Sequence, residues 1–234
     1  MNEQNLSRRL TAVANHVENG MKVADIGSDH AYLPCYLAVQ NKISFAVAGE
    51  VTDGPLQSAQ EQVKSLQMEH VINVRKGDGL EVIAPGEVDA VTICGMGGIL
   101  IASILEKGKD KLEGVSKLIL QPNVAAKWVR EWLEKEDWVL TAEEILKEDG
   151  KIYEVLVAEK AGTSPYSVQG KEKELLFGPY LLKEKSDVFQ EKWSGEKKQW
   201  NNILSQMNNS ESPETEQRKK DLQYKISLAE EILS

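Results

Sequence analysis

A short apolar run that enters a glycine turn constrains the fold of this chain more than any other feature. Residues 23–34 read Val-Ala-Asp-Ile-Gly-Ser-Asp-His-Ala-Tyr-Leu-Pro, a β-rich segment followed by a turn with two carboxylates and a histidine. A dinucleotide-binding fold places a second glycine in this turn, so that a pyrophosphate can approach the backbone. Asp29 stands at that position here, and its charge repels a pyrophosphate and attracts a cation. The turn therefore disfavours NAD and FAD and favours S-adenosylmethionine, which is cationic and carries no phosphate.

Two further acidic residues follow the next predicted strands. Glu50 ends the apolar run of residues 44–50, near the offset of roughly 20 residues at which a βαβ fold presents an acid to ribose hydroxyls. Asp78 lies between two glycines just after the predicted strand of residues 71–75, where a carboxylate can accept a hydrogen bond from an adenine amino group. A plain turn between two elements is the alternative for Asp78.

The order of predicted elements indicates an α/β fold. Strands at 22–26, 44–50, 71–75, 88–94 and 116–121 alternate with helical stretches at 53–69, 98–107 and 124–135, after an N-terminal helix over residues 4–19. This alternation predicts a mostly parallel, doubly wound sheet. Glu148-Asp149-Gly150 separates two last strands, at 138–145 and 152–159, and is typical of a hairpin turn. Such an antiparallel end suits a methyltransferase sheet.

A polar stretch over residues 161–170 divides the chain into a domain of residues 1–161 and a helical tail of residues 171–234. In the tail, apolar residues recur at coiled-coil spacings of seven and four, and after a turn at 208–213 a second apolar stripe faces back. The tail is therefore predicted to be an antiparallel helical hairpin. For Trp193 and Trp200, packing in the seam is favoured over stacking on a base. The two stripes are Leu182, Phe189, Trp193, Trp200 and Leu204, and then Leu222, Ile226, Ala229 and Leu233.

Three motifs and the charged helical tail carry a resemblance to a known family. Residues 25–34, Cys94-Gly-Met-Gly-Gly98 and Gln121-Pro-Asn123 closely resemble the bacterial tRNA (adenine-22-N1)-methyltransferases, the TrmK-like family. The resemblance spans nearly the whole chain. It implies a class I (Rossmann-like) methyltransferase domain with a C-terminal helical hairpin that docks tRNA. It also implies methyl donation from S-adenosylmethionine to N1 of adenine 22 in the D-arm of folded tRNA.

The motifs assign expected roles around the cofactor. Asp29 can pair with the methionine ammonium or with the product cation, His30 can hold the methionine carboxylate or move an amine proton, and Tyr32 can stack on the target base. A capping or core role is the alternative for His30. With Asn123, these three form the candidate catalytic set. The candidate cofactor-binding residues are Asp25, Gly27, Ser28, His30, Glu50, Val51, Asp78, Gly79, Leu80 and Gly95.

The segment after the fourth strand indicates which adenine atom reacts. Methyltransferases that act on exocyclic amines carry an Asn/Asp-Pro-Pro-aromatic motif there, whereas residues 94–98 are glycine-rich and leave room for a flat base. A tight helix-capping turn is the alternative for this segment. For Asn123, the alternative to a substrate contact is the N-cap of a helix that begins near Val124. The candidate substrate-binding residues are Arg8, Arg9, Met96, Gly97, Gly98 and Gln121.

Net charge is the main argument against an RNA substrate. The formal charge is −9, whereas phosphate neutralisation supplies much of the affinity for nucleic acid. Contacts must then come from local basic patches, although each of them is more simply a solvated face. The candidate patches are Arg8 with Arg9, Lys171 with Lys173, Lys197 with Lys198, and residues 218–220.

The remaining features limit location and partners. An apolar run of about 18 residues is absent, and the first six residues lack the blocks of a signal peptide. We therefore expect a cytoplasmic protein, monomeric or weakly dimeric, with no membrane partner.

Cys35 and Cys94 lack metal-type spacing and are expected to be reduced, and no metal is expected. His16 and His70 are expected to be structural or exposed, without acidic partners. A methyltransferase for another RNA position or a small molecule, a non-catalytic RNA-binding protein and, last, an NAD-dependent reductase remain alternatives.

Overall fold

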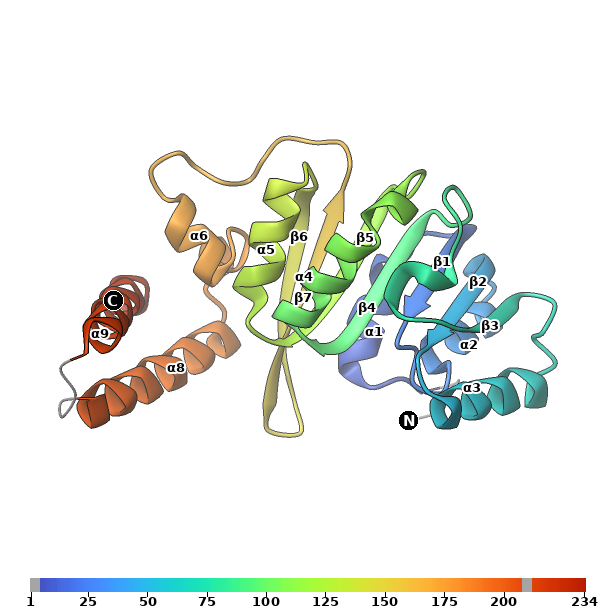
Figure 1. The fold of residues 1–234 in the computed structure, drawn as a ribbon, viewed down its shortest axis with the longest axis horizontal. Coiled ribbons are helices and arrows are strands. Elements are labelled where there is room, and N and C mark those ends of the chain that lie inside the picture. Colours follow the sequence, from blue (N-terminus) through green and yellow to red (C-terminus); the bar gives the residue numbers. More distant parts are fainter. Residues whose placement is uncertain (1–4, 208–211) are drawn as a thin grey trace. The chain divides into compact units, whose positions relative to one another are not determined.

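The computed structural model describes residues 5–207 and 212–234 of the chain. The chain divides into two compact units, Met1–Tyr166 and Ser167–Ser234, and each is described by itself. The first unit contains a sheet flanked by helices, and the described part of the second is helical (Figure 1).

The first unit is built on a mixed sheet, for which seven strands are described, in the order β3-β2-β1-β4-β5-β7-β6. The strands β1 to β5 pair in parallel, and β7 is antiparallel to both β5 and β6. The predicted parallel, doubly wound sheet with an antiparallel end is therefore confirmed. The strands are β1 (Met21–Ile26), β2 (Ile43–Glu50), β3 (Ile72–Lys76), β4 (Ala90–Gly97), β5 (Lys117–Val124), β6 (Val139–Glu148) and β7 (Lys151–Glu159).

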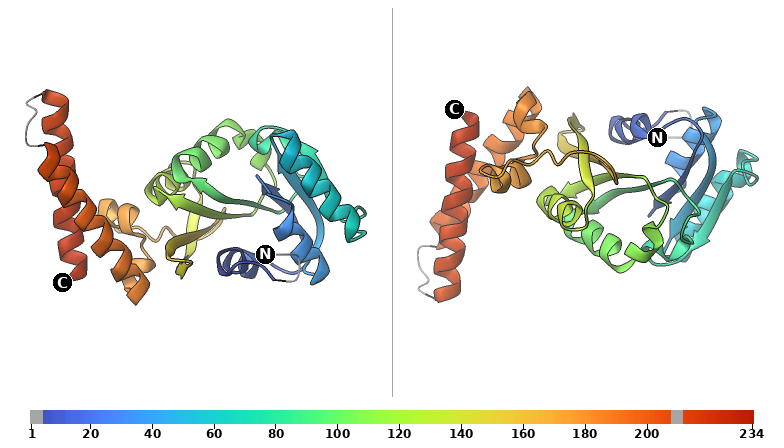
Figure 2. Two further views of the ribbon diagram at one scale, coloured as in Figure 1. Left: turned by 90° about the horizontal axis from the view of Figure 1, so that it is seen from below. Right: turned by 90° about the horizontal axis from the view of Figure 1, so that it is seen from above.

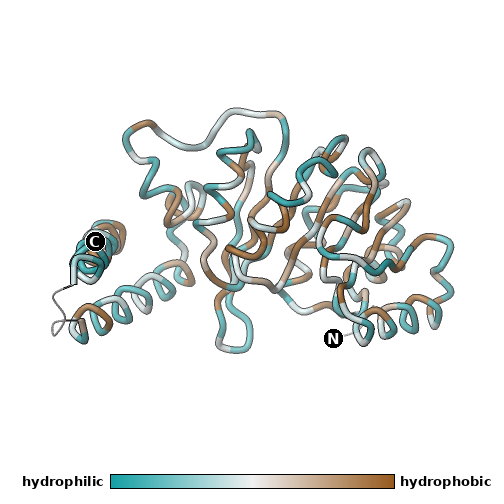
Figure 3. Tube along the Cα trace, in the orientation of Figure 1, coloured by the Kyte–Doolittle hydropathy of each residue, from teal (hydrophilic) through white to brown (hydrophobic). Residues whose placement is uncertain are grey.

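Helices cover both faces of this sheet. Figure 2 shows α1 and α2 on one face and α4 and α5 on the other. The strands between them are apolar along most of their length, whereas the tip of the β6–β7 hairpin is hydrophilic (Figure 3). The helices are α1 (Arg8–His16), α2 (Tyr32–Val39), α3 (Asp53–Ser65), α4 (Gly98–Lys107) and α5 (Ala126–Lys135), with short 3-10 turns η1 (Gly79–Val82) and η2 (Lys109–Leu112).

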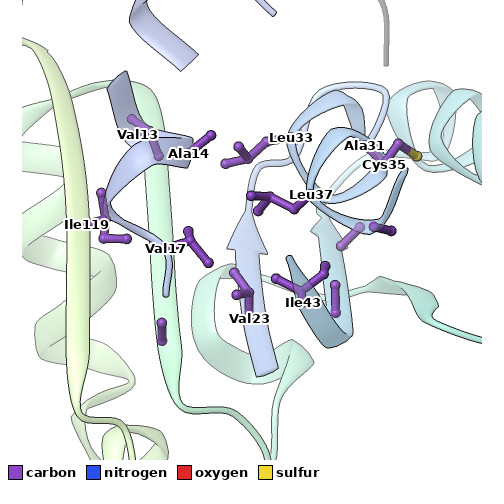
Figure 4. Close-up of a cluster of buried hydrophobic side chains, with 14 of the residues drawn as sticks. Val13, Ala14, Val17, Val23, Ala31, Leu33, Cys35, Leu37, Ile43 and Ile119 are labelled. Carbon is purple, nitrogen blue, oxygen red and sulfur yellow. The ribbon is translucent and has the colours of Figure 1, made fainter. Parts of the chain in front are cut away.

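The core beneath α1 and α2 follows from the apolar periodicity of the chain. Val13 of α1 and Val17 at its end are four positions apart, as are Leu33 and Leu37 of α2, and all four are almost fully buried. They meet Val23 of β1 in one cluster (Figure 4). The apolar face of α1 is therefore what holds it against the sheet.

The predicted N-terminal helix over residues 4–19 is too long. Residue 4 lies outside the described residues, and α1 begins only after Ser7, whose Oγ accepts a hydrogen bond from the Leu10 N–H. Val17 is already extended. The N-cap serine stops the helix at one end, which the apolar periodicity alone does not show.

The turn between β6 and β7 matches its prediction. Asp149 and Gly150 both adopt positive φ, 49° and 75°, as a two-residue type I′ turn requires. Glu148 and Lys151 pair directly across it. The hairpin places β7 in the sheet beside β5, with its inner residues facing the same core.

A buried ion cluster joins α5 to this hairpin. Arg130 of α5 is fully buried, and its Nε and Nη2 donate to Glu143 Oε1 of β6 and Glu154 Oε2 of β7 at 2.7 and 2.5 Å. Burial opposes the guanidinium charge, but the two carboxylates outweigh it and raise the pKa of Arg130. The Arg130 guanidinium therefore stays charged inside the fold.

The second unit contains α6 (Lys171–Phe177), α7 (Leu181–Glu184), α8 (Asp187–Gln206) and α9 (Pro213–Leu233). The two long helices, α8 and α9, pack against each other, as the predicted hairpin requires. Most of the predicted turn at 208–213 lies outside the described residues. Leu182 does not belong to the long helix: Lys185 is left-handed and Ser186 caps α8, so the stripe predicted from Leu182 onwards is interrupted.

Trp193 is a packing residue of the second unit. It is 5% exposed, and its ring lies 4.5 Å from that of Phe177 and 6.2 Å from that of Phe189, centroid to centroid. Trp200 is partly buried, with its ring 6.1 Å from that of Trp193. These aromatic contacts are with α6 and within α8, so packing of the two tryptophans in the α8–α9 seam stays a prediction.

Candidate active site

The turn that follows β1 has an unusual backbone. Gly27, Asp29, His30 and Ala31 all have positive φ, between 43° and 69°. A left-handed conformation costs an L-residue roughly 1–2 kcal/mol, so neighbouring contacts must hold three such residues in a row. Backbone strain of this kind is concentrated at functional sites. The turn lies at the carboxyl edge of the parallel strands, where α/β folds bind their ligands.

Asp25 anchors this turn from beneath. Asp25 is 4% exposed, and its carboxyl group accepts hydrogen bonds from the Ser28 hydroxyl and from the Thr92 hydroxyl, each at 2.6 Å. Thr92 lies opposite Asp25 in the β1–β4 register. Burial raises the pKa of Asp25, while the two hydroxyls and the charge of Arg9 oppose that rise. Asp25 therefore ties the turn to both β1 and β4.

Glu50 holds the other side of the turn. It is 6% exposed, and its Oε1 accepts the Asp29 N–H at 2.5 Å. The Gly27 and Ser28 N–H groups donate to the Gly49 carbonyl at 2.9 and 3.2 Å. Within the described chain, Oε2 of Glu50 makes no hydrogen bond. Burial raises the pKa of Glu50, and the Asp29 N–H opposes this. A buried carboxylate with one uncommitted oxygen suits a pair of ribose hydroxyls.

A cavity of about 300 Å³ opens beside the turn. Arg9, Asp25, Gly27, Ser28, Asp29, Gly95, Met96 and Asn123, all predicted site residues, line it together with Cys94, Leu10, Leu33 and Tyr153. The structure thus brings the first glycine turn, the Cys94–Met96 segment and the end of β5 to one place. Tyr153 comes from β7 and was missed, because no local motif marks it and only the antiparallel end of the sheet carries it there.

The acidic walls of this cavity fit a cation. Asp25 and Asp29 both line it, and Asp29 is exposed. The sulfonium and ammonium groups of S-adenosylmethionine match these two carboxylates in charge. Among the described residues, no group of three or more metal-ligating side chains gathers.

Asp78, Gly79 and Leu80 line a separate cavity of about 250 Å³, together with Ile104 and Lys107 of α4. The Gly77 N–H donates to the Glu50 carbonyl at 2.9 Å, so the Asp78 turn lies beside the end of β2. Asp78 is exposed, and its N–H donates to the Glu81 carboxylate at 3.2 Å in a capping box. The structure around Asp78 is therefore a plain turn, as the alternative interpretation expected. The contact between Asp78 and adenine stays a prediction.

His30 and Tyr32 do not line the first cavity. Their rings stack on each other at 5.4 Å, and His30 Nε2 lies 3.5 Å from Asp29 Oδ1. The His30 side chain is 46% exposed, which argues against the core alternative. Val51 is 54% exposed. His30 and Val51 are therefore exposed beside the turn, whereas Tyr32 is partly buried.

The predicted glycine loop is part of the sheet. β4 continues to Gly97 with irregular pairing after Cys94, and Gly95 has a φ of 77°. Gly95 and Met96 line the cavity, whereas Gly97 and Gly98 do not. Gly98 has a packing role, because a Cβ there would overlap the carbonyl oxygen of Ala125.

The alternative that made Asn123 an N-cap is wrong. α5 begins at Ala126, and the capping position is held by Ala125 in the left-handed conformation. The Asn123 Nδ2 instead donates to the Gly95 carbonyl at 2.7 Å, and its Oδ1 accepts from Gln121 Nε2 at 3.1 Å. Asn123 is thereby held at the cavity rather than at the helix.

Several predicted surface residues have partners that the sequence did not reveal. Arg8 donates to the Lys147 carbonyl at 3.1 Å. Lys173 and Lys219 lie 2.7 Å from carboxylates of Glu231 and Glu216, respectively. These basic groups are already engaged, which weakens the patches that contain them. The prediction that His16 has no acidic partner is wrong, because its Nε2 lies 2.6 Å from Glu144 Oε1, a residue 128 positions away.

The cysteines and the remaining histidine are as expected. Cys35 is buried and Cys94 partly buried, and both are free. Burial raises the pKa of the Cys94 thiol, as does the charge of Asp25. His70 Nδ1 lies 3.0 Å from the Gln67 carbonyl oxygen on the surface.

The strand order, the antiparallel β7 and the acidic turn after β1 define a class I, Rossmann-like methyltransferase that uses S-adenosylmethionine. The family model described as TrmK, tRNA (adenine(22)-N(1))-methyltransferase, matches residues 23–231, and the chain belongs to this family.

Relatives agree with that assignment over the full length. The tRNA (adenine(22)-N(1))-methyltransferase of Bacillus subtilis (strain 168) is 52% identical over 238 residues, which cover 100% of this chain and 99% of that protein. The crystal structure of the B. subtilis M1A22 tRNA methyltransferase TrmK has a TM-score of 0.93 and 49% identity, covering 99% and 100% of the two chains. Streptococcus pneumoniae Sp1610, solved in complex with S-adenosyl-L-methionine, has a TM-score of 0.87 and 40% identity, covering 98% and 100%.

Glu50→Gln is expected to weaken S-adenosylmethionine binding by about 1–3 kcal/mol, because ribose hydroxyls lose a charged acceptor. Since burial raises the pKa of Glu50, wild-type affinity should fall on acidification already above pH 4.5, the ordinary pKa of the group, and the variant should lack that part of the pH dependence. Isothermal titration calorimetry measures both effects. Glu61→Gln, at an exposed position of α3, is the control and should bind as the wild type does. Equal affinity of the Glu50 variant and the wild type would remove Glu50 from the ribose site.

Proposed function

We propose that this protein transfers a methyl group from S-adenosylmethionine to N1 of adenine 22 in the D-arm of tRNA. One observation carries the proposal: a single cavity is lined both by the acidic cofactor turn and by the Gly95, Met96 and Asn123 side of the sheet. A donor and a flat acceptor can therefore meet in it. The name of the B. subtilis relative supports the choice of acceptor. A tRNA substrate also implies a cytoplasmic location.

The proposed methyl transfer depends on positioning of the reactants more than on acid–base catalysis. S-adenosylmethionine supplies a methyl group on a sulfonium, which adenine N1 can accept with its in-plane lone pair and without prior deprotonation. Asp29 lies where a carboxylate can balance the methionine ammonium or the positive charge that attack leaves on the base. Gly95 carries no side chain and leaves room for the ring beside Asn123. Holding the two reactants in line supplies most of the rate.

Incubation of the protein with labelled S-adenosylmethionine and unmodified tRNA tests the proposal. tRNA with adenine at position 22 should be labelled, and the same tRNA with guanine at that position should not. Equal labelling of both would indicate another RNA position. Labelling of neither, with a small molecule as acceptor, would favour the alternative that the net charge of −9 suggests.

Short linear RNA is expected to be a poor substrate. N1 lies on the pairing edge of adenine, so the base must be unpaired and turned into the cavity at a cost of a few kcal/mol. Contacts to the rest of a folded tRNA must offset that cost. Initial rates on folded tRNA and on an oligonucleotide with the D-arm sequence compare the two substrates. Equal efficiency would show that recognition is confined to the cavity and would contradict docking of a folded arm.

A further inference from the structure

Four groups from three elements form a continuous set of hydrogen bonds at the edge of the cavity. Arg9 Nη1 of α1 donates to Gln121 Oε1 of β5, and the Gly95 N–H of β4 donates to the same oxygen at 3.0 Å. Gln121 Nε2 donates to Asn123 Oδ1 at 3.1 Å. Asn123 Nδ2 donates to the Gly95 carbonyl at 2.7 Å, which closes the ring.

The two donors to Gln121 Oε1 fix the orientation of both side-chain amides, Gln121 and Asn123. Two N–H donors converge on Gln121 Oε1, so the amide cannot turn over without placing its NH₂ against them. Gln121 is fully buried, and water cannot replace a lost partner there. Its NH₂ must therefore point at Asn123, which turns Asn123 Oδ1 toward Gln121 and Nδ2 toward Gly95. Arg9, which donates to this ring from outside, is the only charged residue of the four.

Two further contacts hold Arg9 in place. Its guanidinium lies 5.5 Å from the centre of the Tyr153 ring, and the carboxylate of Glu148 caps the first turn of α1 through the Arg9 N–H at 3.2 Å. Arg9 lines the same cavity as Asp25 and Asn123. The predicted role of Arg9 in a phosphate-binding patch does not use any of these contacts.

The fixed orientation of the Asn123 amide determines which base edge it can hydrogen-bond. Among the described residues, Asn123 makes only the two bonds of this ring, which leaves one lone pair on Oδ1 and one hydrogen on Nδ2. Adenine presents its N6 amine as a donor next to N1, whereas guanine presents an oxygen acceptor. An Oδ1 held in one orientation accepts from the N6 amine and leaves the N1 lone pair free.

We propose that Arg9 is a positioning residue that acts through Gln121 to set the orientation of the Asn123 amide, and thereby selects adenine by its N6 amine. The proposal rests on the proposed function, since it takes adenine N1 as the acceptor. It assigns to Arg9 a role in base selection rather than in phosphate binding.

The test compares two tRNA substrates, one with adenine and one with unsubstituted purine at the target position. Purine keeps N1 but lacks the exocyclic amine. The wild type should prefer adenine by about tenfold in kcat/KM, the scale of one neutral hydrogen bond. Arg9→Met, which keeps the length of the side chain but donates no hydrogen bond, should reduce that preference, because only the Gly95 N–H then holds Gln121 Oε1. Lys64→Met, at an exposed position of α3, is the control and should keep it.

A second variant makes the test independent of how Arg9→Met folds. Gln121→Glu keeps acceptors for Arg9 and Gly95 but cannot donate to Asn123, so the adenine preference should fall in the same way. Calorimetry with S-adenosylmethionine checks that each variant retains its cofactor site.

The outcomes separate the possible failures. A tenfold preference that persists in both variants would overturn the proposal, as would a wild type with no preference. If Arg9→Met keeps the preference but lowers the salt dependence of tRNA binding by about one phosphate, Arg9 is a phosphate contact and the proposal fails. A wild type that methylates neither tRNA would instead contradict the proposed function.

Discussion

Arg130→Met is expected to lower the free energy of unfolding by about 3–5 kcal/mol, because it leaves two carboxylates buried without a counter-charge. Arg130, Glu143 and Glu154 have side chains that are 0%, 0% and 2% exposed, so water cannot take the place of the guanidinium. For a chain of this size the midpoint of thermal unfolding should fall by roughly 10 °C. Urea unfolding followed by circular dichroism measures the change.

Arg75→Met is the matched control for this prediction. Arg75 also forms a bidentate pair, with Glu87 at 2.6 and 2.9 Å, but the two side chains are 29% and 22% exposed. Partly exposed pairs contribute about 1 kcal/mol or less, so the loss should be several times smaller than for Arg130. Similar losses of unfolding free energy in both variants would mean that burial does not explain the cost of breaking the Arg130 cluster.

A chain that ends at Tyr166 is expected to bind S-adenosylmethionine normally and to lose tRNA methylation by about 100-fold or more. The first unit, Met1–Tyr166, contains the whole sheet and every residue that lines the first cavity. The second unit is a separate helical structure with its own aromatic packing around Trp193. If it docks the folded arm of tRNA, its removal takes away contacts that offset the cost of turning out the base. Calorimetry with the cofactor and initial rates on tRNA measure the two properties.

The comparison needs a variant that keeps the second unit but changes its charge. Lys197→Gln with Lys198→Gln in the full chain should weaken tRNA binding and make it less dependent on salt, while cofactor affinity stays unchanged. Full activity on tRNA from the shortened chain would assign the helices to stability or assembly and contradict a docking role.

Local sequence patterns predicted the sheet well because each strand is marked by its own apolar run and each turn by its own residues. The hairpin turn at Asp149 and Gly150 and the acidic turn around Asp29 are readable from neighbours in the chain. The long-range contacts are not. Thr92 reaches Asp25 only through strand register, and Tyr153 reaches the cavity only because β7 inserts beside β5.

The same limit applies to Arg9 and Leu182. The sequence predicts Arg9 as part of a basic patch and does not show its hydrogen bond to Gln121, which lies 112 positions away. Leu182 fitted the apolar stripe by spacing, but a left-handed Lys185 separates it from α8. Spacing shows which residues share a face of a helix, and it does not show where a helix ends.

The identity of the methylated nucleoside decides most directly whether the cavity works as proposed. Unmodified tRNA is treated with the protein and S-adenosylmethionine, digested, and its nucleosides are separated by liquid chromatography with mass spectrometry. We expect 1-methyladenosine, and sequencing should locate it at position 22. N6-methyladenosine would mean that the glycine-rich segment of residues 94–98 supports chemistry at an exocyclic amine, and it would contradict N1 as the reacting atom.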